Sequence, residues 1–496
     1  MRTGLMSVAG VVGAAVIAWS CAGILPHDDC LDYGTCTGLA AEGGPGGEAG
    51  GGDGGGEGGV VIPTTCDLTK SAKDSPDCVD DGVGIFASPA GDDTAPGTKL
   101  KPVRSITKAV ELATAATKPR VYLCAGTYND SVEVKTPISI FGGFTCTPPG
   151  DWKNTGAGVT WNATKPDFAL RISGVGSKVF VDDVEIDAKD GTTPGESSIA
   201  VFVADSAEVA FERVVINSGK GIAGATKQKK SAAANAAKGS PAANPLGGDG
   251  AKNVCADGDS TGGKGGTIGQ DNALPGEPQA VGGGSAGKPV TSCVGGGSGG
   301  TGALGAVGPN GGAIAIRGTL TAAGWKPMPG NSGNPGSKAQ GGGGGGARAG
   351  AGGGGGAGGC GGEGGGGGGG GGASIAIGAI SSKITLTASR VNSAASGNGG
   401  DAAGGQPGQP HGGGGAGGTG VPDDGCPGGQ GGEGGNGGAG GGGAGGISTP
   451  ILYKGALPTM TDTTLTKGTA GTKGHGGDAV GPDGPDGDAQ DTIKAD

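Results

Sequence analysis

The residues best suited to chemistry are acidic side chains in two segments about 30 residues apart. They are Asp182, Asp183, Glu185, Asp187, Glu208 and Glu212, and Arg171 and Arg213 lie near them in the sequence. If the two segments stack in space, their carboxylates supply the oxygen ligands that Ca²⁺ prefers. The same residues also suit the acidic, solvent-facing side of an exported protein, so the pattern leaves both interpretations open.

The chain offers little for nucleophilic catalysis assisted by a base. His27, His411 and His475 are the three histidines, and residues 66–220, which have the most ordinary composition, contain none. An activated Ser or Cys nucleophile usually needs such a base beside it. Calcium-binding nonapeptide repeats require Gly-Gly-x-Gly-x-Asp-x-apolar, and only isolated fragments occur, at 399–401 and 476–478. We therefore predict no catalytic residue, no cofactor and no metal site.

A repeat indicates which elements position these side chains. Residues 178–187, 208–217 and 383–392 align without gaps, with apolar residues at the same positions and Asp187, Asn217 or Asn392 at the end. The second copy begins 30 residues after the first, and the third begins 175 residues after the second. Short strand-like segments repeated at a period of about 20–50 residues are typical of a solenoid.

The composition excludes several classes of function. Glycine contributes 128 of the 496 residues, aromatic residues make up 3%, and the net charge is −11. Nucleic-acid binding depends mainly on phosphate contacts from clustered basic residues. The small cluster at 227–230 is isolated and fits a solvated loop better, so we predict no nucleic-acid partner.

The first residues are typical of an export signal. Arg2 precedes an apolar stretch, residues 5–19, that is too short to span a bilayer comfortably. Ala18-Trp19-Ser20-Cys21 resembles a lipoprotein cleavage box, although Ala18 and Trp19 are unusual in it. We predict lipidation of Cys21, with plain secretion and cleavage after Ser20 or Ala22 as the alternative.

The remaining cysteines also favour export. Without Cys21 there are ten, an even number, and none forms a Cys-x-x-Cys pair. Disulfides in an oxidising compartment therefore fit better than metal binding. Connectivity cannot be deduced from sequence, and the simplest hypothesis pairs neighbours: Cys30 with Cys36, Cys66 with Cys78, Cys124 with Cys146, Cys255 with Cys293, and Cys360 with Cys426. For Cys124 and Cys146 we expect strands one turn apart, about 4.8 Å, within disulfide reach.

Composition divides the chain into five parts. We expect a signal peptide at 1–21, a flexible glycine-rich linker at 22–65, the first solenoid turns at 66–220, further turns interrupted by glycine-rich inserts at 221–467, and a Gly/Asp-rich tail at 468–496. Residues 105–116 read as a short helix because Ile106, Ala109, Val110 and Ala113 share one face. Residues 313–316 read as a strand that opens a degraded turn.

Residues 88–144 carry a family resemblance. Ser88-Pro89, Pro96-Gly97-Thr98, Pro102 before the helix, Ala125-Gly126-Thr127-Tyr128 and the segment 138–144 resemble the start of pectin-lyase-like right-handed parallel β-helix proteins. The resemblance implies an all-β solenoid with a short N-terminal capping helix. Polysaccharide lyases of this fold hold calcium with surface carboxylates and abstract a proton with a basic residue. The added glycine-rich (PGRS-like) inserts are similar to those of large bacterial surface proteins and lipoproteins.

The inserts contain a three-residue repeat. Within 341–372, 25 of 32 residues are glycine, and 428–439 repeats Gly-Gly-x strictly, without the Pro of collagen. An extended helix with three residues per turn would place Gln430, Glu433, Asn436 and Ala439 along one edge and leave the glycines to pack against like segments. Disorder is the alternative, because glycine loses the most conformational entropy on ordering.

A row of corner residues predicts where the inserts leave the solenoid. Asn217, Asn331 and Asn392 each precede an insert, and Asp187 occupies the same place in a turn without a long insert. Asn and Asp tolerate left-handed backbone and bond their own turns. We therefore expect Asp187, Asn217, Asn331 and Asn392 to stack as a corner row. The inserts would then form one layer, tied by Cys360 and Cys426, that serves as the interaction surface.

Two functions remain open at the level of sequence. The first is a non-enzymatic bacterial structural or adhesion protein, exported to the outer membrane, the cell surface or the extracellular space. Its partner would be a surface or polysaccharide ligand, and it would meet the membrane only through the lipid at Cys21. The alternative is a carbohydrate-active enzyme similar to polysaccharide lyases, since one fold hosts many functions.

Overall fold

The computed structural model describes residues 62–279, 282–289, 291–294 and 297–496. The expected signal peptide, the lipidation site Cys21 and the pair Cys30 and Cys36 lie outside these residues. Among the helices that are described, none has the length and apolar character needed to cross a membrane.

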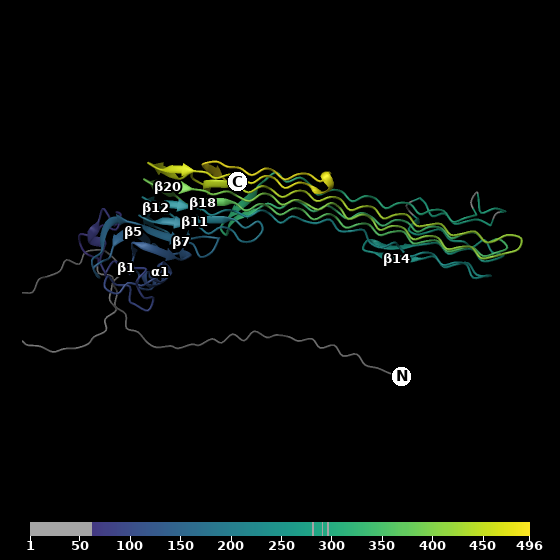
Figure 1. Cartoon of the computed structure of the whole chain (residues 1–496), viewed down its shortest axis with the longest axis horizontal. Coiled ribbons are helices and arrows are strands. Elements are labelled where there is room, and N and C mark those ends of the chain that lie inside the picture. Colours follow the sequence, from purple (N-terminus) through teal and green to yellow (C-terminus); the bar gives the residue numbers. More distant parts are fainter. Residues whose placement is uncertain (1–61, 280–281, 290, 295–296) are drawn as a thin grey trace, which may run out of the picture. The chain divides into compact units, whose positions relative to one another are not determined.

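Three parallel sheets form a β-helix, in which each sheet receives one strand from each turn of the chain (Figure 1). Sheet A contains β1 (Gly84–Ala87), β2 (Arg120–Cys124), β5 (Ser139–Thr145), β9 (Lys178–Asp182), β12 (Glu208–Glu212), β19 (Ile384–Thr387) and β22 (Thr459–Thr461), with β6 (Lys153–Ala157) antiparallel to β5. Sheet B contains β3 (Gly126–Asn129), β7 (Val159–Asn162), β10 (Glu185–Asp187), β13 (Val215–Asn217), β20 (Arg390–Asn392) and β23 (Thr464–Thr466). Sheet C contains β4 (Val132–Val134), β8 (Leu170–Ser173), β11 (Ser198–Ala204), β18 (Ser374–Ile380), β21 (Ser448–Lys454) and β24 (Thr492–Lys494). This all-β architecture confirms the predicted fold class.

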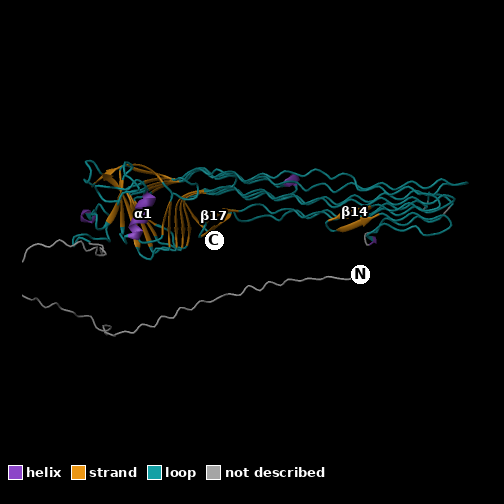
Figure 2. Cartoon of the chain, turned by 90° about the horizontal axis from the view of Figure 1, so that it is seen from below, coloured by secondary structure: helices purple, strands orange, loops and turns teal. Residues whose placement is uncertain are grey.

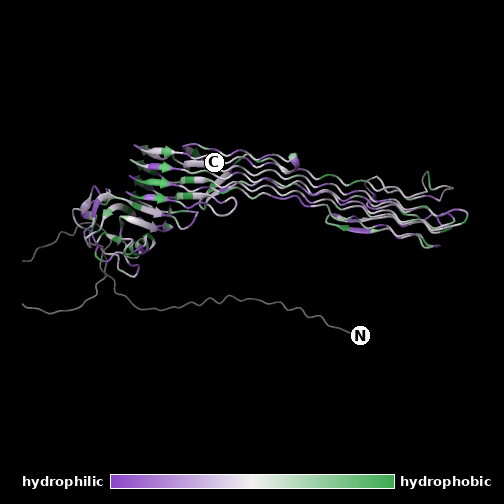
Figure 3. Cartoon of the chain, viewed as in Figure 1, coloured by the Kyte–Doolittle hydropathy of each residue, from purple (hydrophilic) through white to green (hydrophobic). Residues whose placement is uncertain are grey.

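Residues at the same position of the sequence repeat are paired in neighbouring strands. Lys178 pairs with Glu208 in sheet A, and Asp187 pairs with Asn217 in sheet B. The third copy continues the stack, because Asn217 pairs with Asn392. Alternate residues of each strand point into the solenoid, and a continuous apolar core of mostly Val, Ile and Leu fills it. Figure 3 shows this difference in colour, with apolar residues concentrated in the β-helix strands.

The predicted capping helix is α1 (Ile106–Ala115), and its predicted apolar face is buried. The Ser105 hydroxyl accepts a hydrogen bond from the backbone N–H of Lys108, which caps the first turn. The Asp130 carboxylate accepts a further hydrogen bond from the N–H of Ile106 at 3.0 Å. The helix packs against β1, β2 and β4 and closes the first turns of the core.

The glycine-rich segments all leave the β-helix at the corner between sheets B and C. They follow β13, β20 and β23 and return to β18, β21 and β24. The described residues of 219–312, 328–373, 394–447 and 467–489 run side by side as extended chains, which we call the glycine array (Figures 1 and 2). The expectation that the inserts leave from one edge is confirmed for those that follow Asn217 and Asn392.

Hydrogen bonds order the glycine array in three directions. The amides of residues 341 to 346 donate in turn to the carbonyls of Glu277, Gly356, Gly300, Leu274, Gly353 and Gly297. Every third residue therefore bonds to the same neighbouring segment, as a chain with three residues per turn requires. A β-strand bonds to two neighbours only, which explains why most of these chains carry no strand assignment. The glycine-rich inserts are therefore ordered, and the alternative of disorder is wrong.

Close packing of the array requires glycine. A Cβ on Gly355 would lie 1.9 Å from the carbonyl oxygen of Gly342, and a Cβ on Gly342 would lie 2.2 Å from that of Gly429. Residues with side chains occupy the third position of the Gly-Gly-x triplet where that position faces solvent instead of a neighbouring segment. Gln430, Glu433 and Asn436 are exposed, as the triplet predicts, whereas Ala439 is buried.

Amide and carboxylate side chains terminate the hydrogen bonding at the edges of the array. The Oδ1 of Asn436 accepts a bond from the N–H of Gly408 at 2.9 Å. The Oε1 of Gln409 does the same for the N–H of Cys360 at 3.0 Å. These side chains replace the carbonyl that a further segment would supply.

Candidate functional site

The carboxylates singled out in the sequence separate into three places. Asp182, Asp183 and Glu212 gather beside Arg213 at the corner between sheets A and B. Glu208 lies at the other end of its strand and pairs with Lys178 at 3.1 Å and with Lys383 at 2.6 Å. Glu185 and Asp187 lie in sheet B. They form no single row of calcium ligands.

Arg213 forms the ion pairs at this corner. Its guanidinium donates to both carboxylate oxygens of Asp183, at 2.7 and 3.0 Å, and to Glu212 at 3.1 Å. Arg171, the other arginine singled out, instead pairs with Glu133 at 3.4 Å. Within the described part of the chain, no group of three or more His, Cys, Asp or Glu side chains is arranged to hold a metal ion.

Asp182 is the unusual member of this corner cluster. It is 1% exposed, and neither carboxylate oxygen has a hydrogen-bond partner among the described residues. Burial, followed by the nearby charge of Glu212, raises the pKa of Asp182 to about 8, although Arg213 opposes the change. A buried neutral carboxyl affects stability, but none of the main cavities is lined by Asp182.

Three of the four predicted corner residues form a hydrogen-bonded row. Asn217 donates to Asp187 at 2.7 Å, and Asn392 donates to Asn217 at 2.8 Å. None of the three has left-handed backbone, contrary to the reason given for placing Asn and Asp there. Positive φ occurs instead at the other two corners, for example at Asp183 and Asp205. The row is held by side-chain amides.

Asn331 does not belong to the corner row, so that prediction is wrong. The expected strand at 313–316 is also absent, and no β-helix turn forms there. The segment instead holds an antiparallel hairpin of β16 (Gly318–Thr321) and β17 (Gly324–Pro327), which covers the outer face of sheet C. Asn331 lies in the glycine array, where its side chain donates to the carbonyl of Gly312 at 2.9 Å. A polar residue before a glycine run is too weak a signal to define a corner.

Four disulfides form among the described residues, and two differ from the neighbour pairing. Cys66–Cys78 and Cys124–Cys146 are confirmed, and the latter has a Cα–Cα distance of 5.7 Å. The predicted pairs Cys255–Cys293 and Cys360–Cys426 are wrong, because the bonds are Cys255–Cys360 and Cys293–Cys426. Folded-back chains bring residues 105 and 133 positions apart into contact, which sequence separation does not reveal. Cys293–Cys426 joins the insert that follows Asn217 to the insert that follows Asn392.

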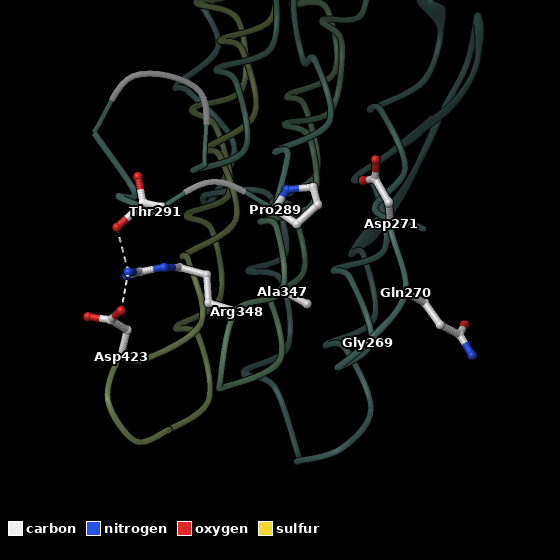
Figure 4. Close-up of a pocket in the computed structure, with 8 residues that line it drawn as sticks. All are labelled: Gly269, Gln270, Asp271, Pro289, Thr291, Ala347, Arg348 and Asp423. Atoms are coloured by element: carbon white, nitrogen blue, oxygen red, sulfur yellow. Dashed lines mark hydrogen bonds and ion pairs between the residues drawn. The ribbon is translucent and has the colours of Figure 1, made fainter.

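The turns at the far end of the glycine array form the candidate site, which we call the tip (Figure 1). The tip comprises residues 243–246, 268–271, 291–294, 347–350 and 420–424. It holds a cavity of about 560 Å³. Arg348 joins two turns, since it donates to the carbonyl of Thr291 at 2.6 Å and pairs with Asp423 at 2.6 Å (Figure 4). Gln270 and Asp271, on another turn, are also among the residues that line the cavity, and the Gln270 side chain points away from Arg348 (Figure 4).

The tip is fixed in place and yet presents apolar side chains to solvent. Val421 is 94% exposed, Val294 is 88% exposed and Leu246 is 59% exposed. The Cys293–Cys426 disulfide lies next to Val294, and the Asn244 side chain accepts the N–H of Ala351 at 2.9 Å. Asp271, Asp423 and Asp424 make the same end acidic.

Sequence reasoning missed the tip, although a signal was present. Arg348 and its flanking alanines interrupt the longest glycine run, and Val421-Pro422-Asp423-Asp424 interrupts the next insert. Breaks in a three-residue pattern mark the points where the chain turns. What the sequence could not show is that these breaks meet at one end.

Comparison with known proteins finds a family match for part of the β-helix. Residues 89–238 match a family described as "Protein of unknown function (DUF1565)". That family is associated with β-helix proteins, in agreement with the parallel sheets found here. No curated protein and no solved structure is significantly similar to the chain. The match covers the first turns and the start of the glycine array, and it leaves the tip outside.

Proposed function

We propose that this is an exported, non-enzymatic cell-surface protein that binds its partner through the tip of the glycine array. The observation that carries the proposal is the combination of exposed Val294 and Val421 with a disulfide and an ion pair that fix their turns. A fixed binding surface loses less conformational entropy when a partner binds. The β-helix serves as the base, and the array separates the tip from it.

Several features support export and surface display. Four disulfides suit an oxidising compartment. The N-terminal apolar stretch and Cys21 fit a lipid anchor, with residues 22–65 as the tether. We propose that the protein is anchored at the outer membrane or cell surface. Its partner is a surface polymer that offers apolar contacts and positive charge to the acidic tip.

The alternative proposal, a carbohydrate-active enzyme, rests on the corner cluster at Asp182. Arg213 is already engaged by three carboxylates, and Asp182 is buried away from the main cavities. This geometry favours the interaction role. Incubation with polyuronides and calcium, monitored for unsaturated products, tests the enzyme directly, and any turnover would support it.

Adhesion of coated beads tests the proposal. Beads carrying the full chain are incubated with cell envelopes and with purified surface polysaccharides, and bound beads are counted. Val294→Asp with Val421→Asp should reduce adhesion by about tenfold, because charge replaces the apolar contacts of a binding hot spot. Val480→Asp is the matched control, since Val480 is also an exposed valine in a turn but lies outside the tip. If both variants adhere equally well, the tip is not the binding surface.

A further inference from the structure

A second cavity, of about 250 Å³, lies outside sheet A near its first strands. Its lining is largely apolar and includes Leu100, Pro102, Pro149 and the indole ring of Trp152. Lys99 and Ser88 contribute polar groups. Small-molecule sites typically combine an apolar lining with a few polar groups that fix the orientation of the ligand.

The walls of this cavity are held in place from behind. Trp152 is 8% exposed, and its Nε1 donates to the carbonyl of Lys99 at 3.0 Å. Its ring packs edge-on against Phe86, with ring centroids 4.8 Å apart. The Cys124–Cys146 disulfide fixes the loop that carries Pro149 to β2. The cavity is therefore formed before any ligand binds.

Lys99 is the one charged residue among those that line the cavity. The Lys99 ammonium lies 5.8 Å from the centroid of the Phe86 ring. Lys99 belongs to no ion pair formed among the described residues, whereas the nearby Lys153 pairs with Asp151. Asp81 lies close to Lys99 but accepts its backbone N–H at 2.8 Å. In a chain of net charge −11, an uncompensated ammonium beside an apolar cavity favours an anionic ligand.

We propose that this cavity binds a small organic carboxylate with an aromatic or aliphatic body. The apolar body contacts Trp152, Pro102 and Pro149, and the carboxylate pairs with the Lys99 ammonium. The Ser88 hydroxyl accepts the N–H of Ala90 at 3.4 Å and, among the described residues, has only the Cys146 sulfur, 3.8 Å away, as an acceptor, so its O–H can turn to donate to the second carboxylate oxygen. This proposal does not depend on the function proposed for the tip.

Benzoate and benzyl alcohol are suitable probes, because they share a ring and differ in charge. Titration of the full chain, followed by ligand-observed NMR, should show saturable benzoate binding with a Kd of about 1 mM, as expected for a ligand of this size. Benzyl alcohol should bind at least several-fold more weakly. Lys99→Met keeps the aliphatic stem and removes the charge, and it should raise the benzoate Kd about tenfold.

Lys101→Met is the matched control, since Lys101 lies two residues away, is exposed and does not line the cavity. It should leave the benzoate Kd unchanged. The proposal is overturned if the wild-type chain shows no saturable benzoate binding. It is equally overturned if Lys99→Met and Lys101→Met bind benzoate alike, or if benzyl alcohol binds as tightly as benzoate.

Discussion

Replacing Asp182 with asparagine should stabilise the protein at neutral and alkaline pH but not at pH 4. Asp182 is 1% exposed and lacks hydrogen-bond partners, and its pKa is about 8 in the folded protein. In the unfolded chain the pKa of an aspartate is about 3.9. Between these two values the folded state holds a proton that the unfolded state has released.

The sign of the effect follows from this difference in bound protons. Stability falls as pH rises wherever the folded state binds more protons than the unfolded state. The contribution of neutral Asp182 is therefore fully present below pH 4 and is lost as pH rises through the folded pKa near 8. One proton per molecule changes the free energy of unfolding by about 1.4 kcal/mol per pH unit, so the loss over this range reaches about 5 kcal/mol.

Asp182→Asn removes this titration while it keeps the shape of the side chain. Urea unfolding, followed by tryptophan fluorescence at pH 4, 6 and 8, measures the effect. The variant should match the wild type near pH 4 and exceed its free energy of unfolding by several kcal/mol at pH 8, with about 5 kcal/mol as the upper limit.

The neighbouring Asp183→Asn provides a control of opposite sign. Asp183 forms both short bonds to Arg213, and its replacement weakens a charge-assisted pair. This variant should be less stable than the wild type at pH 7. If the difference between Asp182→Asn and the wild type is the same at pH 4 and pH 8, the assignment of a neutral, buried Asp182 is incorrect.

Three further predictions test the array, the corner row and the disulfides. Gly355→Ala should lower the thermal unfolding midpoint by several degrees, because its Cβ would meet the Gly342 carbonyl at 1.9 Å, whereas Gly413→Ala, whose Cβ would contact only the Lys238 side chain, should leave the midpoint nearly unchanged. Asn217→Ala should cost about 1–3 kcal/mol of unfolding free energy, since it removes two side-chain bonds in the corner row, and Asn331→Ala should cost less than half as much; equal costs would contradict the row. Peptide mapping without reduction should recover Cys293 linked to Cys426 and Cys255 linked to Cys360. Replacing the first pair with serine should lower the unfolding free energy by about 2–5 kcal/mol and speed proteolysis at 420–424; unchanged proteolysis would show that this bond does not fix the tip.

The β-helix could be predicted because its signals are local. The alignment of 178–187 with 208–217 and 383–392 became register in sheets A and B without correction. The face of α1 followed from helical spacing, since four apolar residues recur at intervals of three and four. Neighbouring turns contact each other directly, so a pattern within one turn is sufficient to place it.

The tip and the two disulfides of the glycine array could not be predicted because they depend on distant parts of the chain. Arg348 meets Asp423, and Cys293 meets Cys426, only after the inserts have folded back several times. Neighbour pairing failed for the four cysteines in the array and succeeded for the four outside it, Cys66 with Cys78 and Cys124 with Cys146. Loop closure entropy grows slowly with length, so a long insert leaves many pairings open.

The sequence by itself determined the repeated strands of the β-helix, the capping helix, the corner at which the inserts after Asn217 and Asn392 leave, and the three-residue period of the array. Each of these depends on residues within one turn or one triplet, where steric and hydrogen-bonding preferences act locally. Only the tertiary structure decided which glycine segments lie side by side, which cysteines of the array pair and where the turns meet. Glycine segments are nearly identical in chemistry, and their arrangement is fixed by hydrogen bonds in three directions and by the few side chains that end them.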